Sequence, residues 1–434
     1  AFLTISYFVD KANITDLDFT KDKIYSISQA TKDKLENLDQ KITITTYNMY
    51  EYVEDFANKY ATLNDNITVE KLENLTSKQE WKTEYGLTDT SSFVAVETES
   101  KIKILQDSDL YTYDYSTHEQ IDITEEAITN AILDVTTNIK PKICILTGHN
   151  LYNDGYFQYL ESSLESEVNQ VEYLNLLTAG SIPKDCKVLV ITALKNDIDK
   201  KEKDEILKYI NNGGEILLLM DPNLGKIKTP NFQKILDVYG VKNSEGFIME
   251  ANSSKMVSGA PSYIIASINT SSELVKDINM GLNVCMMTAG KLTFESTDEL
   301  AKKNVTLETL ATASDKAFYR TDLTSSSQTK ISSDESASGA TVAAMLTKTI
   351  SEDKISKLIV FSNTAFATNA QIQMGMYYRY AIEFCNNEDI LLNSVSFLTE
   401  REDNITIRKA GETVTTYDVT ENQTKIILSI IFGI

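Results

Sequence analysis

The chain has 434 residues, of which 63 are acidic and 41 basic, giving a formal net charge of −22 at pH 7. This charge excludes a nucleic-acid-binding protein, because phosphates are neutralised by clustered lysine and arginine, and it argues against wide contact with anionic lipid. The length exceeds that of one typical core, and 42% hydrophobic residues suffice for two domains. Four cysteines, at positions 144, 186, 285 and 385, form no C-x-x-C pair, so neither a zinc site nor a disulfide framework is indicated.

Both ends of the chain are short apolar segments that adjoin polar sequence. Residues 1–9 (AFLTISYFV) and 426–434 (IILSIIFGI) carry no charge, and each is shorter than the ~20 residues of a membrane helix. Residues 1–9 also lack the basic region and the small-residue cleavage site of a signal peptide. We interpret the two segments as parts of two membrane helices, with the polar body of the chain between them. The alternative is a soluble domain that buries them as terminal strands.

A small α/β domain is predicted at residues 41–118, after a membrane-proximal segment at 1–40. A helix near 29–38 is followed by a strand at 41–47, an amphipathic helix at 53–63, a strand at 67–70 and a hairpin at 93–96 and 102–105. This order is typical of a thioredoxin-like domain. Without C-x-x-C such a domain performs no disulfide chemistry, so we expect a recognition or spacer role.

A helix with one apolar face is predicted at residues 119–140. Its apolar positions at helical spacing are Ile128, Ala131, Ile132, Val135 and Ile139. Thr124 is a suitable N-cap, and Pro141 ends the helix because the residue before a proline disfavours the α conformation. Burial of this face is worth several kcal/mol, at about 1.5–3 kcal/mol for each large side chain. We expect the helix to pack on the sheet of the following strand, as a fixed part of the larger domain.

The larger domain is predicted to be α/β and is placed at residues 119–410, with a return segment at 411–434. Short apolar strands at 143–146, 188–192 and 216–220 alternate with helices near 156–168 and 200–212, as in a doubly wound parallel sheet. A helix near 232–239 ends at Gly240. Residues 243–340, rich in Ser, Thr and Asn, are expected to form an irregular insertion. Strands at 342–346 and 358–361 and a helix near 390–398 complete the domain.

Ligands of such sheets bind at the carboxyl ends of the strands. That rule selects seven residues as candidate ligand or partner contacts: Thr147, Gly148, His149, Asn150, Asp221, Asn363 and Thr364. His149 is one of two histidines and the candidate for proton transfer at this edge. The alternative is that these polar groups bind their own loops. In that case His149→Ala is expected to change stability by only about 0.5 kcal/mol, the usual effect at a surface loop.

The motifs of an enzyme are missing around these residues. The strand at 188–192 is followed by residues 193–196 (ALKN), which include no serine or cysteine nucleophile, and G-x-S-x-G occurs nowhere. Two glycine–lysine pairs could belong to phosphate-binding loops, but both are excluded because Met220 and Cys285 stand where the first glycine of such a loop is required. H-E-x-x-H and a D-x-D-x-D-G calcium loop are also absent. We therefore expect no catalysis, no cofactor and no metal.

Tyrosines alternate at positions 111, 113 and 115 and cluster at 377, 378 and 380. On a strand, alternation places them on one face, because side chains have a period of two. Such a stripe suits a protein or glycan ligand, since tyrosine buries a large area and keeps a polar tip. The alternative is that the stripe packs against the neighbouring domain.

Several motifs follow one another along the chain. Residues 16–38 include DLDFT, YSIS and LENL; a glycine–histidine loop at 147–150 follows a strand; residues 213–222 read GGEILLLMDP; and NSVSFLT and ITIR lie at 393–399 and 405–408. In this order they resemble the motifs of the auxiliary, extracytoplasmic subunits of gliding-motility-type ABC transport systems. Two positions differ from that family: Asn150 stands where glycine is usual, and residues 362–366 (SNTAF) replace an acidic turn.

The resemblance implies a Rossmann-like domain, similar to flavodoxin-like and amidotransferase-like folds but without a nucleophile. It also implies a non-catalytic scaffold or recognition module on the extracytoplasmic side of the cell membrane, held there by flanking helices and partnered by an ABC permease and a separate ATPase. Two functions of other classes remain as alternatives. An extracellular hydrolase or amidotransferase-like enzyme would need a nucleophile or metal beside His149. A soluble solute-binding protein would need a deep cleft between its domains.

Overall fold

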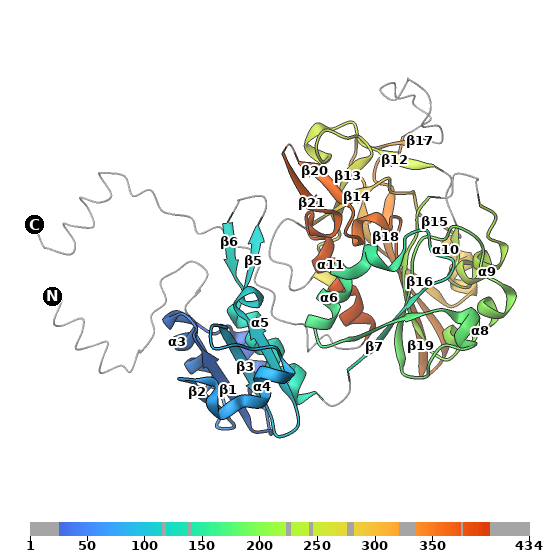
Figure 1. Cartoon of the computed structure of the whole chain (residues 1–434). Helices are drawn as coiled ribbons and strands as arrows, with labels where there is room; N and C mark the ends of the chain where they lie inside the picture. The colour runs from blue at the N-terminus through green and yellow to red at the C-terminus, as the bar shows by residue number, and fades with distance from the viewer. Residues whose placement is uncertain are drawn as a thin grey trace, which may run out of the picture. The chain divides into compact units, whose positions relative to one another are not determined.

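The computed structural model describes residues 26–114, 119–137, 140–222, 227–242, 246–275, 282–320, 336–374 and 376–399. These residues form two compact units, one up to residue 137 and the other from residue 140 (Figure 1). Both units contain helices and strands, so the predicted α/β class is confirmed. The apolar segments at 1–9 and 426–434 lie outside the described residues. None of the described helices is long and apolar enough to cross a membrane.

The first unit is built on a four-stranded sheet. Its elements are α2 (Gln29–Leu35), β1 (Ile42–Tyr47), α3 (Glu51–Tyr60), β2 (Ile67–Lys71), η1 (Leu75–Lys78), α4 (Gln79–Glu84), β3 (Phe93–Glu97), β4 (Ile102–Gln106), η2 (Asp107–Leu110), β5 (Tyr111–Asp114), β6 (Glu119–Asp122) and α5 (Thr124–Thr136). The strand order is β2-β1-β3-β4, with β1 parallel to β2 and antiparallel to β3. The helices and strands predicted between residues 29 and 105 are therefore confirmed.

Helix α5 belongs to this first unit, so the prediction that it packs on the sheet of the larger domain was wrong. Its residues Ile128, Ile132 and Val135 are buried in one cluster with Ile44 of β1 and Val94 of β3. The amphipathic pattern predicts that one face is buried, but not which sheet buries it. Hairpin β3–β4, which precedes α5 in the chain, supplies that apolar surface.

Polar contacts also hold α5 in the first unit. The Glu125 carboxylate accepts hydrogen bonds from the Ser28 N–H (2.9 Å) and the Thr31 hydroxyl (2.7 Å) at the start of α2. The Tyr60 hydroxyl of α3 donates to the Glu125 carbonyl oxygen at 3.0 Å. The predicted boundary at 118–119 thus falls inside the first unit, and the division lies beyond α5.

The second unit is built on a nine-stranded sheet. Its elements up to α9 are β7 (Lys142–Leu146), η3 (Asp154–Phe157), α6 (Gln158–Ser166), β8 (Gln170–Leu174), α7 (Leu176–Ala179), β9 (Cys186–Ile191), α8 (Lys200–Asn211), β10 (Glu215–Leu219) and α9 (Pro230–Tyr239). The elements after α9 are β11 (Val241–Lys242), β12 (Phe247–Met249), η4 (Ser253–Lys255), β13 (Tyr263–Ile268), η5 (Glu273–Val275), β14 (Asn283–Met287), β15 (Thr293–Phe294), α10 (Thr297–Lys302), β16 (Val305–Thr312), β17 (Phe318–Arg320), β18 (Thr341–Ser351), β19 (Lys354–Phe361), η7 (Ala365–Ala367), β20 (Gln371–Met374), β21 (Tyr377–Tyr380), η8 (Ala381–Glu383) and α11 (Asn387–Leu398). The strand order is β14-β13-β16-β18-β19-β10-β9-β7-β8. Strands β8, β7, β9, β10 and β19 are parallel, whereas β18, β16, β13 and β14 each run antiparallel to their neighbours.

Helices cover both faces of the parallel strands (Figure 1). Ile143 and Ile145 of β7 pack in the cluster that includes α6 and α11, while Cys144 and Leu146 pack in the cluster that includes α8 and α9. All four strand residues are at most 3% exposed. Burial on both faces explains why these strands are continuous apolar runs, as the sequence indicated.

The prediction of an irregular insertion at 243–340 was wrong, because this segment holds three strands of the main sheet. Strands β13, β14 and β16 form one side of it, and β16 pairs with β18 from Val305↔Lys348 to Thr312↔Thr341. The segment as a whole is rich in serine, threonine and asparagine, although two of its strands, β13 (YIIASI) and β14 (NVCMM), are largely apolar, so the composition of the whole segment hides them. The sheet is consequently mixed rather than wholly parallel.

Candidate functional site

The seven predicted contact residues all follow parallel strands at their carboxyl ends. Residues 147–150 follow β7, Asp221 follows β10, and residues 363–364 follow β19. Because β9 lies between β7 and β10 in the sheet, His149 and Asp221 do not lie side by side. The seven residues belong to two polar clusters, one centred on His149 and the other on Asp221.

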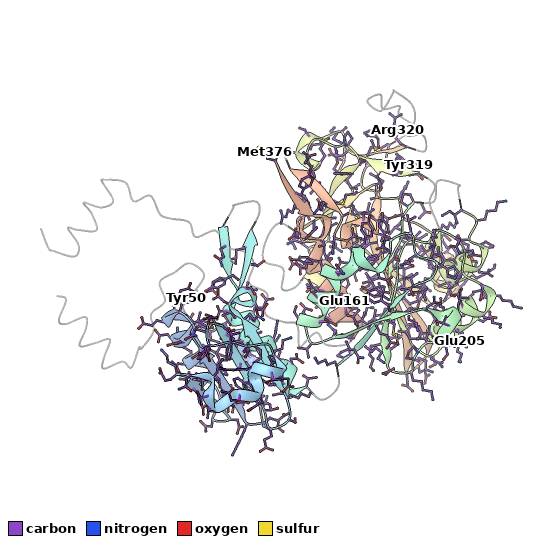
Figure 2. The ribbon with its side chains drawn as sticks, viewed as in Figure 1. Tyr50, Glu161, Glu205, Tyr319, Arg320 and Met376 are labelled. Atoms are coloured by element: carbon purple, nitrogen blue, oxygen red, sulfur yellow. The ribbon has the colours of Figure 1, made fainter. Side chains whose placement is uncertain are left out.

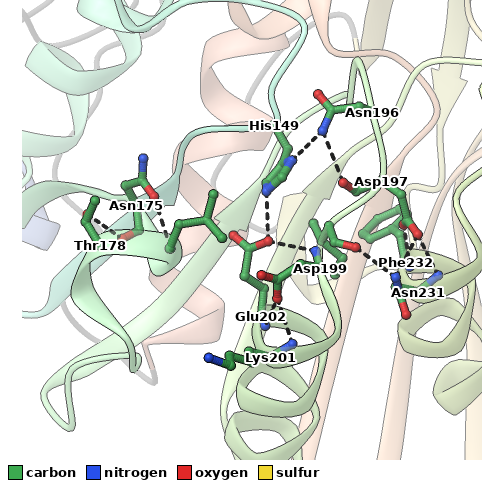
Figure 3. A network of polar contacts seen from close by, with 12 residues as sticks. His149, Asn175, Thr178, Asn196, Asp197, Asp199, Lys201, Glu202, Asn231 and Phe232 are labelled. Carbon is green, nitrogen blue, oxygen red and sulfur yellow. Dashed lines mark hydrogen bonds and ion pairs between the residues drawn. The ribbon is translucent and has the colours of Figure 1, made fainter.

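His149 is held between two side chains that the sequence did not single out. Its Nε2 lies 2.8 Å from Glu202 Oε2, and its Nδ1 lies 2.6 Å from Asn196 Nδ2 (Figure 3). Because the Asn196 amide donates to Nδ1, the ring proton lies on Nε2 and is donated to the Glu202 carboxylate. His149 is only 8% exposed, so the small effect expected of a surface-loop substitution does not apply to it.

Glu202 lies in the first turn of α8 and completes its amino-terminal cap. Asp199 accepts hydrogen bonds from the N–H groups of Lys201 (2.7 Å) and Glu202 (2.9 Å), and Glu202 Oε2 accepts one from the Asp199 N–H (2.8 Å). This reciprocal arrangement is a capping box. The same Oε2 atom accepts from His149, which fastens the histidine to the start of α8. Glu202 Oε1 is buried and has no hydrogen-bond partner within the described part of the chain.

Backbone hydrogen bonds fix the loop that carries His149. The His149 carbonyl oxygen accepts from the Lys195 N–H at 2.8 Å, and the Leu151 N–H donates to the Ala193 carbonyl oxygen at 2.6 Å. The loops after β7 and β9 therefore pair with each other. This pairing brings Asn196 within reach of the imidazole.

The other three predicted residues of this loop stabilise its backbone. The Thr147 N–H donates to the Leu174 carbonyl oxygen at 2.9 Å, and Asn150 Nδ2 donates to the Tyr152 carbonyl oxygen at 2.6 Å. Gly148 has a φ of +100°, a conformation that residues with a Cβ rarely adopt. These contacts are those of the structural alternative considered for the loop.

Asp221 connects the ends of three parallel strands. Its Oδ1 accepts from the Thr364 N–H at 2.7 Å, and its Oδ2 accepts from the Tyr152 hydroxyl at 3.3 Å. Burial raises the pKa of Asp221 above its ordinary value, and these hydrogen bonds oppose that shift. The Thr364 hydroxyl in turn donates to the Leu219 carbonyl oxygen at 2.6 Å and accepts from the Ala193 N–H at 3.1 Å. The cluster is thus closed on the protein's own groups.

Asn363 is fully buried beside this cluster. Its Oδ1 accepts from the N–H groups of Met287 (3.2 Å) and Phe366 (3.0 Å), and its Nδ2 donates to the Met287 carbonyl oxygen. The side chain therefore joins the end of β14 to the segment after β19. An asparagine with these partners has a structural role.

The described residues supply neither a nucleophile for His149 nor a metal site. The imidazole contacts an amide and a carboxylate, and no described serine, threonine or cysteine hydrogen-bonds to it. No group of three or more His, Cys, Asp or Glu in the described ranges could hold a metal ion. The sequence contained one signal of the His149 cluster, the D-x-x-E capping box of Asp199 and Glu202. The histidine contact itself joins residues 53 positions apart and has no local signature.

A surface hollow of about 810 Å³ lies elsewhere in the second unit. It is lined by α10, the start of β16 and the end of β18, including Leu300, Leu307 and Ile350. The turn between β18 and β19 is at the amino end of β19, so this hollow is remote from the carboxyl-end clusters. None of the seven predicted residues lines it.

The two groups of tyrosines differ in exposure. Tyr111 of β5 packs against the core of the first unit, and residue 115 lies outside the described residues. By contrast, Tyr378 and Tyr380 of β21 are 57% and 37% exposed. The second group is therefore a surface feature of the second unit.

The family model described as "ABC-type uncharacterized transport system" matches residues 140–394, more than half of the chain. No curated protein matches the sequence. Among solved structures, the chain is similar to the N-terminal domain of mmIFT52, with 13% identity, a TM-score of 0.43, and coverage of 59% of this chain and 97% of that one. It is also similar to a ThuA-like protein from Parabacteroides merdae, with 13% identity, a TM-score of 0.34, and coverage of 63% and 93%. Likenesses this low carry no argument about function.

Proposed function

Since the chain belongs to the family described as ABC-type uncharacterized transport system, we propose that it is a non-catalytic scaffold or recognition module of its transporter. It is an accessory protein of an ABC-type transport system. Its partners in this proposal are a permease and a separate ATPase, since the sequence has no phosphate loop of its own.

The environment of His149 is the observation that best supports a non-catalytic role. A general base must have a nitrogen within hydrogen-bond reach of the proton that it abstracts. Here Nδ1 accepts from Asn196 and Nε2 donates to Glu202, and the ring is buried. Glu202 is itself committed to the cap of α8. The cluster has the character of a helix anchor, not of an acid–base pair.

The proposal extends to the fold and the location of the chain. The parallel strands lie in the order β8-β7-β9-β10-β19. Numbered by their sequence order among these five strands, this is 2-1-3-4-5, which is the strand order of flavodoxin-like sheets. We infer a Rossmann-like second unit and a thioredoxin-like first unit. The apolar segments at 1–9 and 426–434 support flanking helices in the bilayer. The position on the extracytoplasmic side of the cell membrane rests on the resemblance of the sequence motifs to extracytoplasmic subunits.

Assembly tests the central part of this proposal. The full-length chain, co-expressed with the permease and the ATPase of its own system, should be retained with both after purification in mild detergent. A chain that purifies free of both subunits would refute the scaffold role.

Activity tests the non-catalytic part. The purified chain should show no hydrolysis of a panel of ester, amide and glycoside substrates above that of a His149→Gln variant. An activity that this variant loses would favour the hydrolase alternative.

Location needs a separate test in intact cells. A cysteine placed at the exposed Asn58, in a Cys385→Ser background, should react with a membrane-impermeant maleimide. Labelling only after lysis would place the region on the cytoplasmic side.

A further inference from the structure

We propose that the free edge of β8 is an interaction surface for an extended, basic segment of a partner protein, which pairs with β8 as a further strand of the nine-stranded sheet. We call this surface the β8 edge; it comprises residues 170–174 and the carboxylates beside them. Such a ligand lies beyond the proposed function, since its binding needs neither the permease nor the ATPase.

The opposite edge of the sheet, β14, is closed to a further strand. Two asparagine side chains take the place of a neighbouring strand there. Asn387 Oδ1 accepts from the Cys285 N–H at 2.8 Å, and Asn387 Nδ2 donates to the Cys285 carbonyl oxygen at 2.9 Å. Asn363 makes the same two kinds of hydrogen bond with the backbone of Met287. Of the two ends of the sheet, β8 is the one left for strand addition.

The backbone of β8 has unpaired groups on its outer side. The Gln170 N–H donates to the Pro141 carbonyl oxygen at 2.9 Å, so the even-numbered residues of β8 face β7. In a strand, the N–H and C=O of one residue point to one side and those of the next residue point to the other. The N–H and C=O groups of Val171 and Tyr173 therefore point away from β7. No strand of the described chain lies beyond them.

Strand β8 lacks the usual protection of an edge strand. Such edges carry lysine, proline or a bulge that hinders pairing with another chain. Residues 170–174 (QVEYL) include neither lysine nor proline, and their pairing with β7 runs without a register shift. Gln170 is exposed, and residues 171–173 are half-buried. The edge is thus suited to the addition of an extended segment, which is held by backbone hydrogen bonds.

The surroundings of the β8 edge are acidic. Residues 143–183 contain five carboxylates and neither lysine nor arginine, although the chain has 41 basic residues. Three of the five, Asp154, Glu161 and Glu165, surround the Tyr173 hydroxyl. Burial raises the pKa of Tyr173, and these carboxylates add to the shift. Glu161, on α6 (Figure 2), accepts a hydrogen bond from the Tyr173 hydroxyl at 2.9 Å.

Glu172 places another carboxylate on the edge itself. Its side chain is 40% exposed and lies 3.1 Å from Lys142 Nζ, which also binds Asp185 at 2.8 Å. One lysine thus serves two carboxylates, so a negative charge remains beside the edge. A segment that contains lysine or arginine would bring cations to these carboxylates while its backbone pairs with Val171 and Tyr173.

Charge also distinguishes this ligand from other occupants. If a second copy of the chain paired with the edge about a two-fold axis, Val171 would lie opposite Tyr173 of the copy, and Glu172 would lie opposite its own counterpart. Like charges directly opposite each other destabilise a strand pair. Anionic lipid and nucleic acid are repelled by the same carboxylates. A basic segment of another protein is the occupant that the charges favour.

Binding of synthetic peptides to the full-length chain tests the proposal. The probe is a fluorescent peptide of alternating lysine and valine (KVKVKVK), and its binding is measured by fluorescence anisotropy. The first comparison peptide has the same sequence with a methyl group on every backbone nitrogen, so it keeps the charge but cannot donate backbone hydrogen bonds. The second comparison peptide, EVEVEVE, keeps the backbone but reverses the charge.

Two variants of the β8 edge are compared with one matched control. Glu172→Lys reverses a charge on the edge, and Val171→Pro removes an outward N–H that takes no part in the pairing with β7. Glu352→Lys is the control, because it makes the same change of charge at an exposed position in the turn between β18 and β19. Hydrogen exchange of β7 reports whether each variant keeps its fold.

We expect Glu172→Lys and Val171→Pro each to weaken binding of the basic peptide about ten-fold or more, while Glu352→Lys binds it as the wild type does. The methylated and acidic peptides should not bind. If Val171→Pro loses the protection of β7, Glu172→Lys, which keeps every backbone group, decides the outcome.

Several results would overturn the proposal and leave the scaffold role intact. Equal binding of the methylated peptide, or equal weakening by Glu352→Lys, would mean that the acidic chain attracts any cationic peptide. Binding of the basic peptide no tighter than that of the acidic one would exclude the charge selection. Self-association of the wild type that Val171→Pro abolishes would assign the edge to a second copy of the chain.

Discussion

Replacement of Ile132 by aspartate should unfold the first unit and leave the second unit folded. Ile132 is fully buried in α5, in the same cluster as β1 and β3. Loss of its apolar burial costs about 1.5–3 kcal/mol. A protonated carboxyl group without a partner in an apolar site adds about 1–3 kcal/mol, and a charged one adds more. With the carboxyl protonated the sum is about 2.5–6 kcal/mol, which is a large part of the stability of a small domain.

Hydrogen exchange resolved by peptide is the suitable assay, because a chain with two units has no single free energy of unfolding. In Ile132→Asp, peptides that cover β1 and β3 should lose protection together with α5. Peptides that cover β7 and β9 should keep wild-type protection. Ile132→Val serves as the control and should cost only about 0.5–1.5 kcal/mol.

The result that would refute this reasoning is loss of protection in β7 with β1 unchanged. It would mean that α5 stabilises the second unit, as its sequence position beside β7 first indicated. Equal protection of α5, β1 and β3 in the wild type is a further requirement, because these elements share one core.

Three further substitutions test the carboxyl-end clusters. His149→Ala should destabilise the second unit by about 1–3 kcal/mol, since it removes one of the two donors to Oε2 of the buried Glu202 carboxylate and leaves only the Asp199 N–H. Hydrogen exchange of α8 peptides at increasing denaturant concentration would measure the change. An effect below about 0.5 kcal/mol would contradict this assignment. Gly148→Ala should destabilise the second unit by about 1–3 kcal/mol in the same assay, because Gly148 has a φ of +100° and an added Cβ would lie 3.3 Å from Asn175 Nδ2. Gly180→Ala is the control and should cost less, because its Cβ would meet nothing within 4 Å. Asp221→Asn tests the raised pKa of Asp221 in the folded protein. A raised folded pKa means that the Asp221 carboxyl stabilises the fold fully below its unfolded pKa of about 3.8, and that this stabilisation is lost as pH rises through the folded pKa. The free energy of unfolding, measured at a series of pH values, should therefore rise in Asp221→Asn relative to the wild type as pH increases above 3.8. A difference between the two proteins that does not vary with pH would contradict the raised pKa.

Local patterns were sufficient for most individual elements of the fold. The apolar runs of β7, β9 and β10 are readable because burial on both faces leaves no polar alternation, and α8 carries its own capping box. The carboxyl-end rule likewise located His149, Asp221 and Thr364 at strand ends. These features depend on residues a few positions apart, so the amino-acid order alone specifies them.

The tertiary structure decided which surfaces those elements meet. The apolar face of α5 would suit either sheet, and only the competition between two folded cores assigns it to β3 and β4. Strand β16 pairs with a remote strand, β18, with Thr312 opposite Thr341. Strands β13 and β14 pair with each other, but they join the main sheet only where β13 meets β16, at Ser267↔Thr312. The contact of His149 with Glu202, and the hydrogen bond from the Asn369 N–H to the Tyr156 carbonyl oxygen, likewise join distant segments. Such contacts follow from the packing of the whole chain, because the free energy of burial depends on every surface available and not on the periodicity of one segment.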